Sequence, residues 1–295
     1  MSTTITNAFV EQYKNNIALL VQQKGSRLRE SVVVDSSVVG KNAFYEQLGS
    51  TAAVQVTSRH ADSPLVNSDH QRRRVSLTDY DWGDLIDDVD KVRTLIDPQS
   101  AYAQNAAFAM GRVIDDTIIT AASGSADTGV AGGTATVLPA GQKIAVDYVE
   151  TGSGDSNMTV AKLREAKRSL DANEVPDEDR HLALSASCLQ ALLRNTEVTS
   201  ADFNVVRALV SGELQQFLGF SFRRTERLAI NSDNVRTALA YQRSGIALAV
   251  GRDIVTRIEA RADKRFSTYV YVSMTIGATR LEEEKVVEIL CDEDL

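Results

Sequence analysis

The sequence has few of the residues on which catalytic and metal centres are usually built. Among its 295 residues are two cysteines, three histidines and four prolines. Cys188 and Cys291 are far apart in the chain and form no CxxC pair, so they give no disulfide framework and no zinc-binding pattern. A phosphate-binding GxxxxGK[ST] loop and a GxSxG nucleophile motif are both missing. These absences argue against an enzyme or a metalloprotein, and we expect no cofactor.

Long apolar runs and an excess of positive charge are also missing. No run of 18 apolar residues occurs, which excludes an ordinary transmembrane helix. The N-terminus lacks the cationic start and apolar core of a signal peptide. The formal net charge is −8, which disfavours general affinity for nucleic acid because phosphates would be repelled. The sequence therefore predicts a protein of the reducing cytoplasm without a membrane partner.

The clearest structural signal is a long helix over residues 97–122. Asp97 suits the N-cap and Pro98 the first helical position, where a missing N–H costs nothing. Apolar side chains then recur at steps of three and four between Tyr102 and Ala121, which predicts one apolar helix face. Gly111 lies inside this pattern. It costs about 1 kcal/mol relative to alanine unless another segment packs closely there.

Residues 31–90 have a different character. Short β-prone pieces at residues 32–34, 54–57 and 74–78 are separated by polar residues and turn formers. Some sixty residues with few large hydrophobic side chains cannot bury much of themselves, and a loop of this length is unusual inside a compact domain. Such a stretch needs either disorder or another surface to lie on, and packing on another molecule is the more economical explanation.

Two charged blocks lie in the excursion. The basic block is Arg72, Arg73 and Arg74, and the acidic block is Asp79, Asp81, Asp84, Asp87, Asp88 and Asp90. In a strand, three consecutive arginines present charge to both faces. One interpretation is a solvated surface. The other is a set of contacts between copies of the chain, with arginines of one copy paired to aspartates of another, which would set register more than affinity.

The rest of the chain predicts an α+β protein. Helical spacing starts at residues 158, 187 and 200, with a strand at 182–186 between the first two. The last third is β: strands are predicted at 238–241, 246–250, 254–261, 266–276 and 286–291, and residues 262–264 read as a hairpin turn. One long helix against a late antiparallel sheet is the expected architecture.

Three local patterns resemble catalytic or metal sites and fail on inspection. Asp127-Thr128-Gly129 spells the aspartic-protease tripeptide, but no second copy supplies the other carboxylate. His60, His70 and His181 have no neighbouring ligand set. The segment from Asp79 to Asp84 approaches a calcium loop, but its glycine is one place early and no glutamate closes it.

Several strings resemble the major capsid proteins of tailed bacteriophages, which share the Hong Kong 97-type shell fold. They are QQKGSRLRESV at residues 22–32, SRHADSPL at 58–65, RRRVSLTDYDWGDLIDDVDKVRTLIDPQSAYAQNAAFAMGR at 72–112, and LPAGQKIAVDY at 138–148. The order of elements resembles the same family over nearly the whole chain. An α+β fold is implied, with a long spine helix, an extended β-hairpin loop (E-loop), a P-domain sheet and a small α/β A-domain.

The resemblance also implies domain boundaries. Residues 1–30 would be an N-terminal arm, 31–95 the E-loop, 96–157 the first part of the P-domain with the spine helix, 158–250 the A-domain, and 251–295 the returning P-domain sheet. The charged blocks then become candidate contacts between subunits, namely Arg72, Arg73, Arg74, Asp79, Asp81, Asp84, Asp87 and Asp88. Some relatives cross-link lysine to asparagine; Lys41 and Asn42 lie in the loop, but adjacency assigns them no such role.

The function implied is structural. Copies would self-assemble as hexamers and pentamers into an icosahedral phage head that encloses double-stranded DNA without sequence-specific contact, in the host cytoplasm, and would persist in the virion. A separate scaffolding protein and a portal are expected partners, since the chain starts almost at once with its arm. The alternatives are an encapsulin-like bacterial nanocompartment with the same fold and, remotely, a hydrolase using Asp127.

Overall fold

A computed structural model describes residues 22–36, 38–60, 62–86, 99–149, 154–194 and 216–294. Residues 1–21 of the expected N-terminal arm and the helix expected from residue 200 lie outside these ranges. The chain divides into two compact units. The first comprises Met1–Ser26, Thr78–Ile114 and Arg252–Ile276, and the second comprises Arg27–Leu77, Asp115–Gly251 and Gly277–Leu295.

The first unit contains most of a long β-hairpin. Strands β12 (Ile246–Arg261) and β13 (Ser267–Arg280) are joined by the 3-10 turn η6 (Ala262–Lys264), and β4 (Thr78–Ile86) pairs antiparallel with β13. The full strand order of this sheet is β1-β12-β13-β4, where β1 (Val33–Asp35) runs parallel to the start of β12. Alternation along β13 buries one face, as the sequence predicts. Its buried members are Val270, Val272, Met274 and Ile276.

The predicted long helix is confirmed as α2 (Gln99–Ser123), with 25 residues. Ala106 and Met110 are buried, in agreement with the predicted apolar stripe. Gly111 has the close neighbour that its position requires. A Cβ at Gly111 would lie 2.5 Å from the carbonyl carbon of Gly25 and 2.7 Å from the amide nitrogen of Ser26. Glycine at this position lets the segment before residue 27 cross the helix at backbone distance.

Replacing Gly111 with alanine tests this crossing. Alanine gains about 1 kcal/mol in helix propensity, but backbone atoms cannot yield the space for a Cβ as a flexible side chain would. We expect the free energy of unfolding to fall by about 1–2 kcal/mol, measured by urea denaturation. Thr120→Ala, at an exposed position of the same helix, is the matched control and should be neutral or stabilising. Stabilisation by Gly111→Ala would contradict the close approach.

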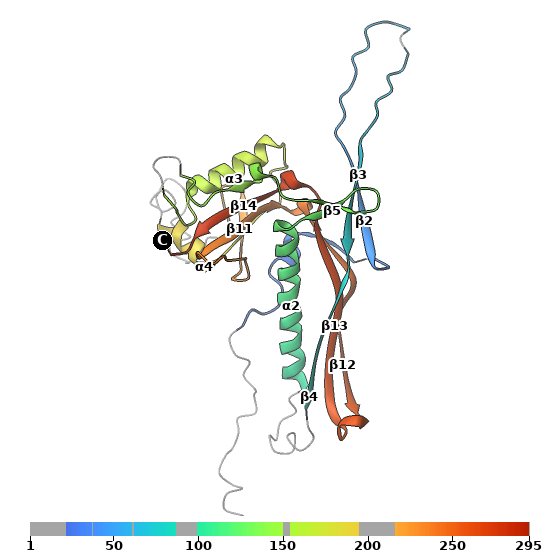
Figure 1. Cartoon of the computed structure of the whole chain (residues 1–295), viewed down its shortest axis with the longest axis vertical. Helices are drawn as coiled ribbons and strands as arrows, with labels where there is room; N and C mark the ends of the chain where they lie inside the picture. The colour runs from blue at the N-terminus through green and yellow to red at the C-terminus, as the bar shows by residue number, and fades with distance from the viewer. Residues whose placement is uncertain are drawn as a thin grey trace, which may run out of the picture. The chain divides into compact units, whose positions relative to one another are not determined.

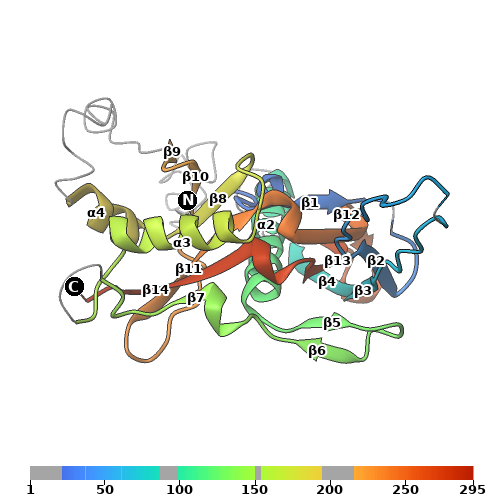
Figure 2. The ribbon, with the colours of Figure 1, turned by 90° about the horizontal axis from the view of Figure 1, so that it is seen from above.

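The second unit contains a six-stranded mixed sheet in the order β7-β14-β11-β8-β10-β9. The strands are β7 (Lys143–Ile144), β8 (Arg180–Leu184), β9 (Gln216–Phe217), β10 (Phe220–Arg224), β11 (Val235–Gln242) and β14 (Val286–Asp292). Helices α3 (Val160–Ala172) and α4 (Ala186–Arg194) run along it (Figure 2) and share an apolar core with it. Thr159 caps α3, accepting from the amide of Lys162 at 3.2 Å.

One expectation for this sheet is wrong. The resemblance to tailed-phage capsid proteins placed residues 251–295, and with them the final strand, in the returning P-domain sheet. Instead β14 pairs antiparallel with β11 along its whole length, from Val286↔Tyr241 to Asp292↔Val235, and parallel with β7. The physical reason is burial: Val286, Val287, Ile289 and Cys291 of β14 are all fully buried, with Val287, Ile289 and Cys291 in the core beneath α3 and α4.

A second sheet of this unit has the order β2-β3-β5-β6. Strands β2 (Asn42–Leu48) and β3 (His70–Ser76) form a hairpin, and β5 (Ala126–Thr128) and β6 (Thr134–Thr136) form a short neighbouring one. Between β2 and β3 the chain continues outward through residues 49–69 (Figure 1). The strand expected at residues 54–57 does not form; these residues are exposed and are in no strand. Single 3-10 turns are η2 (Arg29–Ser31), η3 (Ala140–Gln142), η5 (Arg243–Gly245) and η7 (Glu283–Lys285).

Candidate assembly site at the base of the hairpin

The three consecutive arginines lie on β3, at the base of the β2–β3 hairpin. As predicted for a strand, they alternate between faces. Arg72 and Arg74 keep 38% and 29% of their side chains exposed, whereas Arg73 keeps 5%. Arg72 and Arg74 therefore lie on a face of β3 that is open to solvent, and Arg73 lies on the buried face.

On the open face, each arginine is paired within the chain. Arg72 Nη2 lies 2.5 Å from Glu46 Oε1 on β2, and its guanidinium lies 5.3 Å from the centre of the Phe44 ring. Arg74 Nη2 lies 2.6 Å from Asp127 Oδ2 on β5. Exposed pairs of this kind contribute about 0–1 kcal/mol each, so they orient the arginines more than they stabilise the fold.

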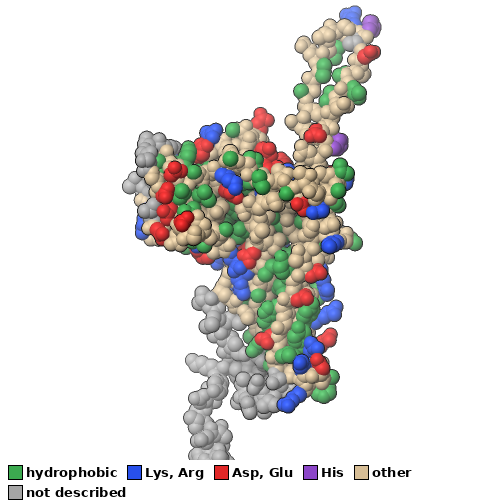
Figure 3. Space-filling view, in the orientation of Figure 1, with side chains coloured by type: hydrophobic (Ala, Val, Ile, Leu, Met, Phe, Trp, Pro, Cys, Tyr) green, Lys and Arg blue, Asp and Glu red, His purple; other side chains and the backbone are tan. Residues whose placement is uncertain are grey.

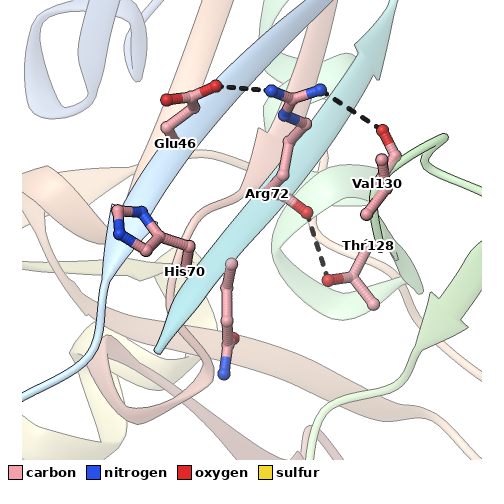
Figure 4. Close-up of a pocket in the computed structure, with 7 residues that line it drawn as sticks. Glu46, His70, Arg72, Thr128 and Val130 are labelled. Carbon is pink, nitrogen blue, oxygen red and sulfur yellow. Dashed lines mark hydrogen bonds and ion pairs between the residues drawn. The ribbon is translucent and has the colours of Figure 1, made fainter. Parts of the chain in front are cut away.

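A shallow hollow of about 340 Å³ opens on this face (Figure 4). Thr128 Oγ1 donates a hydrogen bond to the Arg72 carbonyl at 3.1 Å, which ties β5 to β3. Arg72 Nη1 approaches the Val130 carbonyl at 3.4 Å, and the His70 ring borders the opposite side. Apart from Gly129 and Val130, the residues that line the hollow have polar or charged side chains.

On the buried face, Arg73 belongs to an ionic cluster. Its Nη2 lies 2.5 Å from Glu283 Oε2, and its Nε donates to the Leu281 carbonyl at 3.0 Å. Glu283 Oε1 in turn lies 3.6 Å from Nε of Arg280, which is fully buried. We call Arg73, Glu283 and Arg280 the buried triad. One carboxylate thus balances two guanidinium groups, on the hairpin base and at the end of β13.

Arg280 also closes the C-terminal end of α2. Its Nη1 donates to the carbonyls of Ala122 and Gly124 at 2.8 and 2.7 Å, and its Nη2 donates to the Thr136 carbonyl at 3.0 Å. Carbonyls at a helix C-terminus have no intrahelical donor and carry partial negative charge, so a guanidinium there is favourable. Burial lowers the pKa of Arg280, and the Glu283 carboxylate opposes that shift.

The structure corrects the sequence hypothesis for Arg73. Its charge is met inside the chain by Glu283, so Arg73 is not an accessible contact between copies. For Arg72 and Arg74 the hypothesis stays open. The described aspartates have partners on their own sheet: Asp79 accepts from Thr275 Oγ1 at 2.6 Å and Asp81 accepts from the Tyr271 hydroxyl at 2.7 Å. Asp84 accepts from the amide of Leu85, and Asp87, Asp88 and Asp90 lie outside the described residues.

The remaining candidate sites of the sequence have structural partners. Asp127 on β5 forms an ion pair with Arg74 on β3. His181 is buried, and its pKa is lowered chiefly by burial, with Arg223 adding to the shift. Cys188 and Cys291 are buried free thiols of one core. In the part of the chain that the structure describes, no three potential ligands gather to hold a metal ion, and no helix could cross a membrane.

Sequence reasoning missed Glu46, Glu283 and Arg280. Glu283 stands in the run Glu282-Glu283-Glu284, which is typical of a solvated surface. Its distance of 210 residues from Arg73 leaves no local pattern that could have paired them. Periodic spacing in a sequence indicates which side chains share one face of one helix or strand. The buried triad instead joins side chains from different elements.

Comparisons with known proteins agree with one another. A family model described as phage capsid protein matches residues 5–293. In the capsid structure of cyanophage P-SCSP1u, a chain that is 18% identical has a TM-score of 0.72, over 98% of this chain and 94% of that one. The corresponding chain of Ralstonia phage GP4 is 11% identical with a TM-score of 0.73, over 96% and 95%.

The acid-stable capsid of Helicobacter pylori bacteriophage KHP30 provides a third likeness. Its chain is 9% identical, with a TM-score of 0.73 over 99% of this chain and 98% of that one. Among curated protein sequences, none matches. At these identities the structural likeness demonstrates the fold, and the family model covers nearly the whole length of the chain.

Proposed function

The chain belongs to the phage capsid protein family, and from this premise we propose how its copies build the shell. It is a structural protein of the virion with the Hong Kong 97-type capsid fold, and copies of it form the shell. In our proposal they assemble as hexamers and pentamers into an icosahedral head that encloses double-stranded DNA. We assign it no catalytic residue and no cofactor.

The observation that carries the proposal is the arm of the β2–β3 hairpin, residues 49–69 (Figure 1). Apolar side chains along it are largely exposed: Leu65 at 90%, Val56 at 75% and Val54 at 58%. Large exposed apolar segments of this kind mark protein–protein contacts. Because the arm buries little on its own chain, the surface that covers it belongs to another subunit.

The domain boundaries expected from the sequence remain our proposal, with two refinements. The expected boundaries are residues 1–30 for the N-terminal arm, 31–95 for the E-loop, 96–157 for the P-domain with its spine helix, 158–250 for the A-domain and 251–295 for the returning P-domain. The pairing of β14 with β11 supports counting the final strand with the A-domain sheet. The pairing of β4 with β13 likewise supports ending the E-loop before Thr78.

Further partners follow from the same role. We propose that a scaffolding protein and a portal take part in assembly in the host cytoplasm, and that packaged DNA makes no sequence-specific contact. The net charge of −8 supports a lining that does not bind the genome. A bacterial nanocompartment is not favoured, since the matching family model is that of a phage capsid protein.

The test compares the assembly of the parent chain with that of variants altered in the arm of the β2–β3 hairpin, residues 49–69. We expect the parent chain, expressed with the proteins of its own phage, to give closed shells by negative-stain electron microscopy. Val56→Asp/Leu65→Asp should leave a folded subunit by circular dichroism and reduce closed shells at least tenfold, because charge cannot be buried at the contact. Val56→Ile/Leu65→Met keeps the apolar surface and should assemble as the parent does. Failure of the parent to assemble would overturn the proposal.

A further inference from the structure

The two cysteines of the chain lie in one core, although they are far apart in the sequence. Cys188 is in the first turn of α4, and Cys291 is on the final strand, β14. Both are fully buried, in the apolar core that α3 and α4 share with the six-stranded sheet. Both are free thiols. Folding thus brings together two nucleophiles for which the sequence indicated no pairing.

The hydroxyl of Ser185 joins the two segments that carry the cysteines. The Cys188 amide donates to Ser185 Oγ at 3.1 Å, and Ser185 Oγ donates to Glu293 Oε1 at 2.5 Å. Ser185 immediately precedes α4, and Glu293 immediately follows β14. Both cysteines therefore lie at the same end of the core, next to this junction.

The two thiol groups are in contact. Cys291 donates a hydrogen bond to the Cys188 sulfur, and this bond is the main reason that the pKa of Cys188 is lowered to about 7. The same bond raises the pKa of Cys291 well above its ordinary value, and burial adds to that rise. Cys188 is thus the thiol that ionises first, while Cys291 keeps its proton.

Two further groups favour a thiolate at Cys188. The N-terminal turn of α4 carries the partial positive charge of its amides. The Lys162 ammonium, whose Nζ donates to the Leu290 carbonyl at 2.8 Å, interacts electrostatically with both cysteines. Glu293 acts in the opposite sense. A thiolate is the form of cysteine that reacts with oxidants, so the arrangement prepares one of the two sulfurs for attack.

We propose that Cys188 and Cys291 form a disulfide within the chain when it meets hydrogen peroxide. The Cys188 thiolate attacks one peroxide oxygen and breaks the O–O bond, which gives a sulfenic acid and a hydroxide ion. Cys291 then gives up its proton and attacks the sulfenic sulfur, which forms the S–S bond and expels the second oxygen as water. In total, two thiols lose two protons and two electrons, and one peroxide becomes two water molecules.

The oxidant has to be small, because neither sulfur reaches the surface. Figure 3 shows acidic and basic side chains on the surface of the unit that contains α3 and α4, and both thiols lie beneath that surface. Hydrogen peroxide is uncharged and little larger than water, so local opening of the core is enough to admit it. Oxidised glutathione is bulky and charged, and it should react far more slowly.

The disulfide would tie the start of α4 to the final strand. It closes a long loop of the chain, which restricts the unfolded state and so stabilises the fold. Its use in the virion rests on the proposed function. Disulfides persist outside the reducing cytoplasm, and a virion leaves the host cell. The released particle would thereby gain a stability that the assembling subunit lacks.

Oxidation of the unassembled subunit tests the cross-link. With hydrogen peroxide, we expect the mass of the chain to fall by that of two hydrogen atoms, and both thiols to disappear from a titration under denaturing conditions. A digest without reductant should contain one peptide pair that joins Cys188 to Cys291. The midpoint of thermal unfolding should rise by about 5–10 °C and return to its first value after reduction with dithiothreitol.

Single serine variants identify the role of each sulfur. Serine at position 291 can still donate to Cys188, so in Cys291→Ser the Cys188 sulfenic acid should form, persist and react with dimedone. In Cys188→Ser, the remaining thiol is oxidised at least tenfold more slowly, because Cys291 lies on a strand and not at a helix N-terminus. Neither variant should show a rise in the unfolding midpoint on oxidation.

The parent chain decides the matter even if a serine variant fails to fold. Two free thiols after oxidation, a disulfide between chains, or a sulfinic acid in place of the cross-link would each overturn the inference. An unchanged or lower unfolding midpoint of the cross-linked chain would overturn its stabilising role. Shells that keep two thiols in peroxide contradict the cross-link alone. A parent chain that forms the cross-link but no shells contradicts the proposed function alone.

Discussion

Replacing Glu283 with alanine is expected to lower the free energy of unfolding by about 3–5 kcal/mol, measured by urea denaturation of the unassembled subunit. Among the described residues, Glu283 is the carboxylate that forms ion pairs with both Arg73 and Arg280, and its side chain is 10% exposed. Its removal leaves two buried guanidinium groups without their ion-pair partner. The cost arises from these uncompensated charges and not from the loss of a favourable ion pair, because buried pairs roughly repay their own desolvation.

A double-variant cycle distinguishes the cost of uncompensated buried charges from the loss of a favourable ion pair. Glu283→Ala/Arg73→Met removes one of the stranded charges, so it should be less destabilised than Glu283→Ala alone. Arg280 then keeps its three backbone carbonyl partners, Ala122, Gly124 and Thr136. Glu282→Ala is the matched control. The Glu282 side chain, which pairs with Lys285, is 43% exposed, so the loss of this pair should lower the free energy of unfolding by no more than about 1 kcal/mol. Additive effects of the Glu283 and Arg73 substitutions would contradict the triad.

The second large effect is expected at Lys162, a fully buried lysine of α3. Its Nζ donates to the carbonyls of Val146, Ser156 and Leu290 at 2.9, 2.6 and 2.8 Å. Lys162→Ala should lower the free energy of unfolding by about 3–5 kcal/mol, since it removes the packed aliphatic stem and leaves a cavity. Thermal and urea unfolding of the subunit would measure the loss.

Replacing Lys162 with methionine separates the contribution of the packed aliphatic stem from that of the charged ammonium group. Val146 O also accepts from the Ser156 amide, and Ser156 O also accepts from the Asp292 amide, so these carbonyls keep a donor without the lysine. Lys162→Met should therefore cost about 1 kcal/mol or less, near the net value of an ordinary hydrogen bond. A methionine variant as unstable as the alanine variant would show that the ammonium group, and not the stem, stabilises the fold.

The lowered pKa of Lys162 predicts the direction in which the free energy of unfolding changes with pH. Burial lowers the pKa of Lys162 below the ordinary value of a lysine, and Cys291 and Cys188 oppose that shift. Between the folded pKa and the unfolded one, the unfolded chain binds more protons, so the free energy of unfolding of the parent rises with pH in that window. The rise is absent from the methionine variant. The difference between the two pH profiles isolates the lysine from tyrosines that titrate nearby.

Much of the secondary structure could be predicted from local patterns. The apolar stripe of α2, the alternation along β13 and the turn at residues 262–264 each repeat with the period of their element. Gly111 was unfavourable in a helix unless a segment packed closely against it, and Gly25 does so. The low apolar content of residues 31–90 was enough to predict an arm that cannot bury itself.

The partners of the charged residues could not be predicted. Arg73 and Glu283 are 210 residues apart, and Glu283 reads as one of three solvated glutamates. The resemblance placed the final strand in the returning P-domain sheet, whereas it pairs with β11. In both cases the partner is decided by burial against segments that are distant in the sequence, and the local spacing of residues carries no information about that burial.

The sequence by itself determined the class of protein, the long helix and the existence of an extended arm, because these depend on composition and on periods of two and 3.6 residues. The tertiary structure decided which acid meets each arginine and which edges of the sheet remain open. A charge has the same local signature whether it lies in solvent or in a buried cluster. Only folding, by removing water from Arg73, Glu283 and Arg280, makes the difference energetically large.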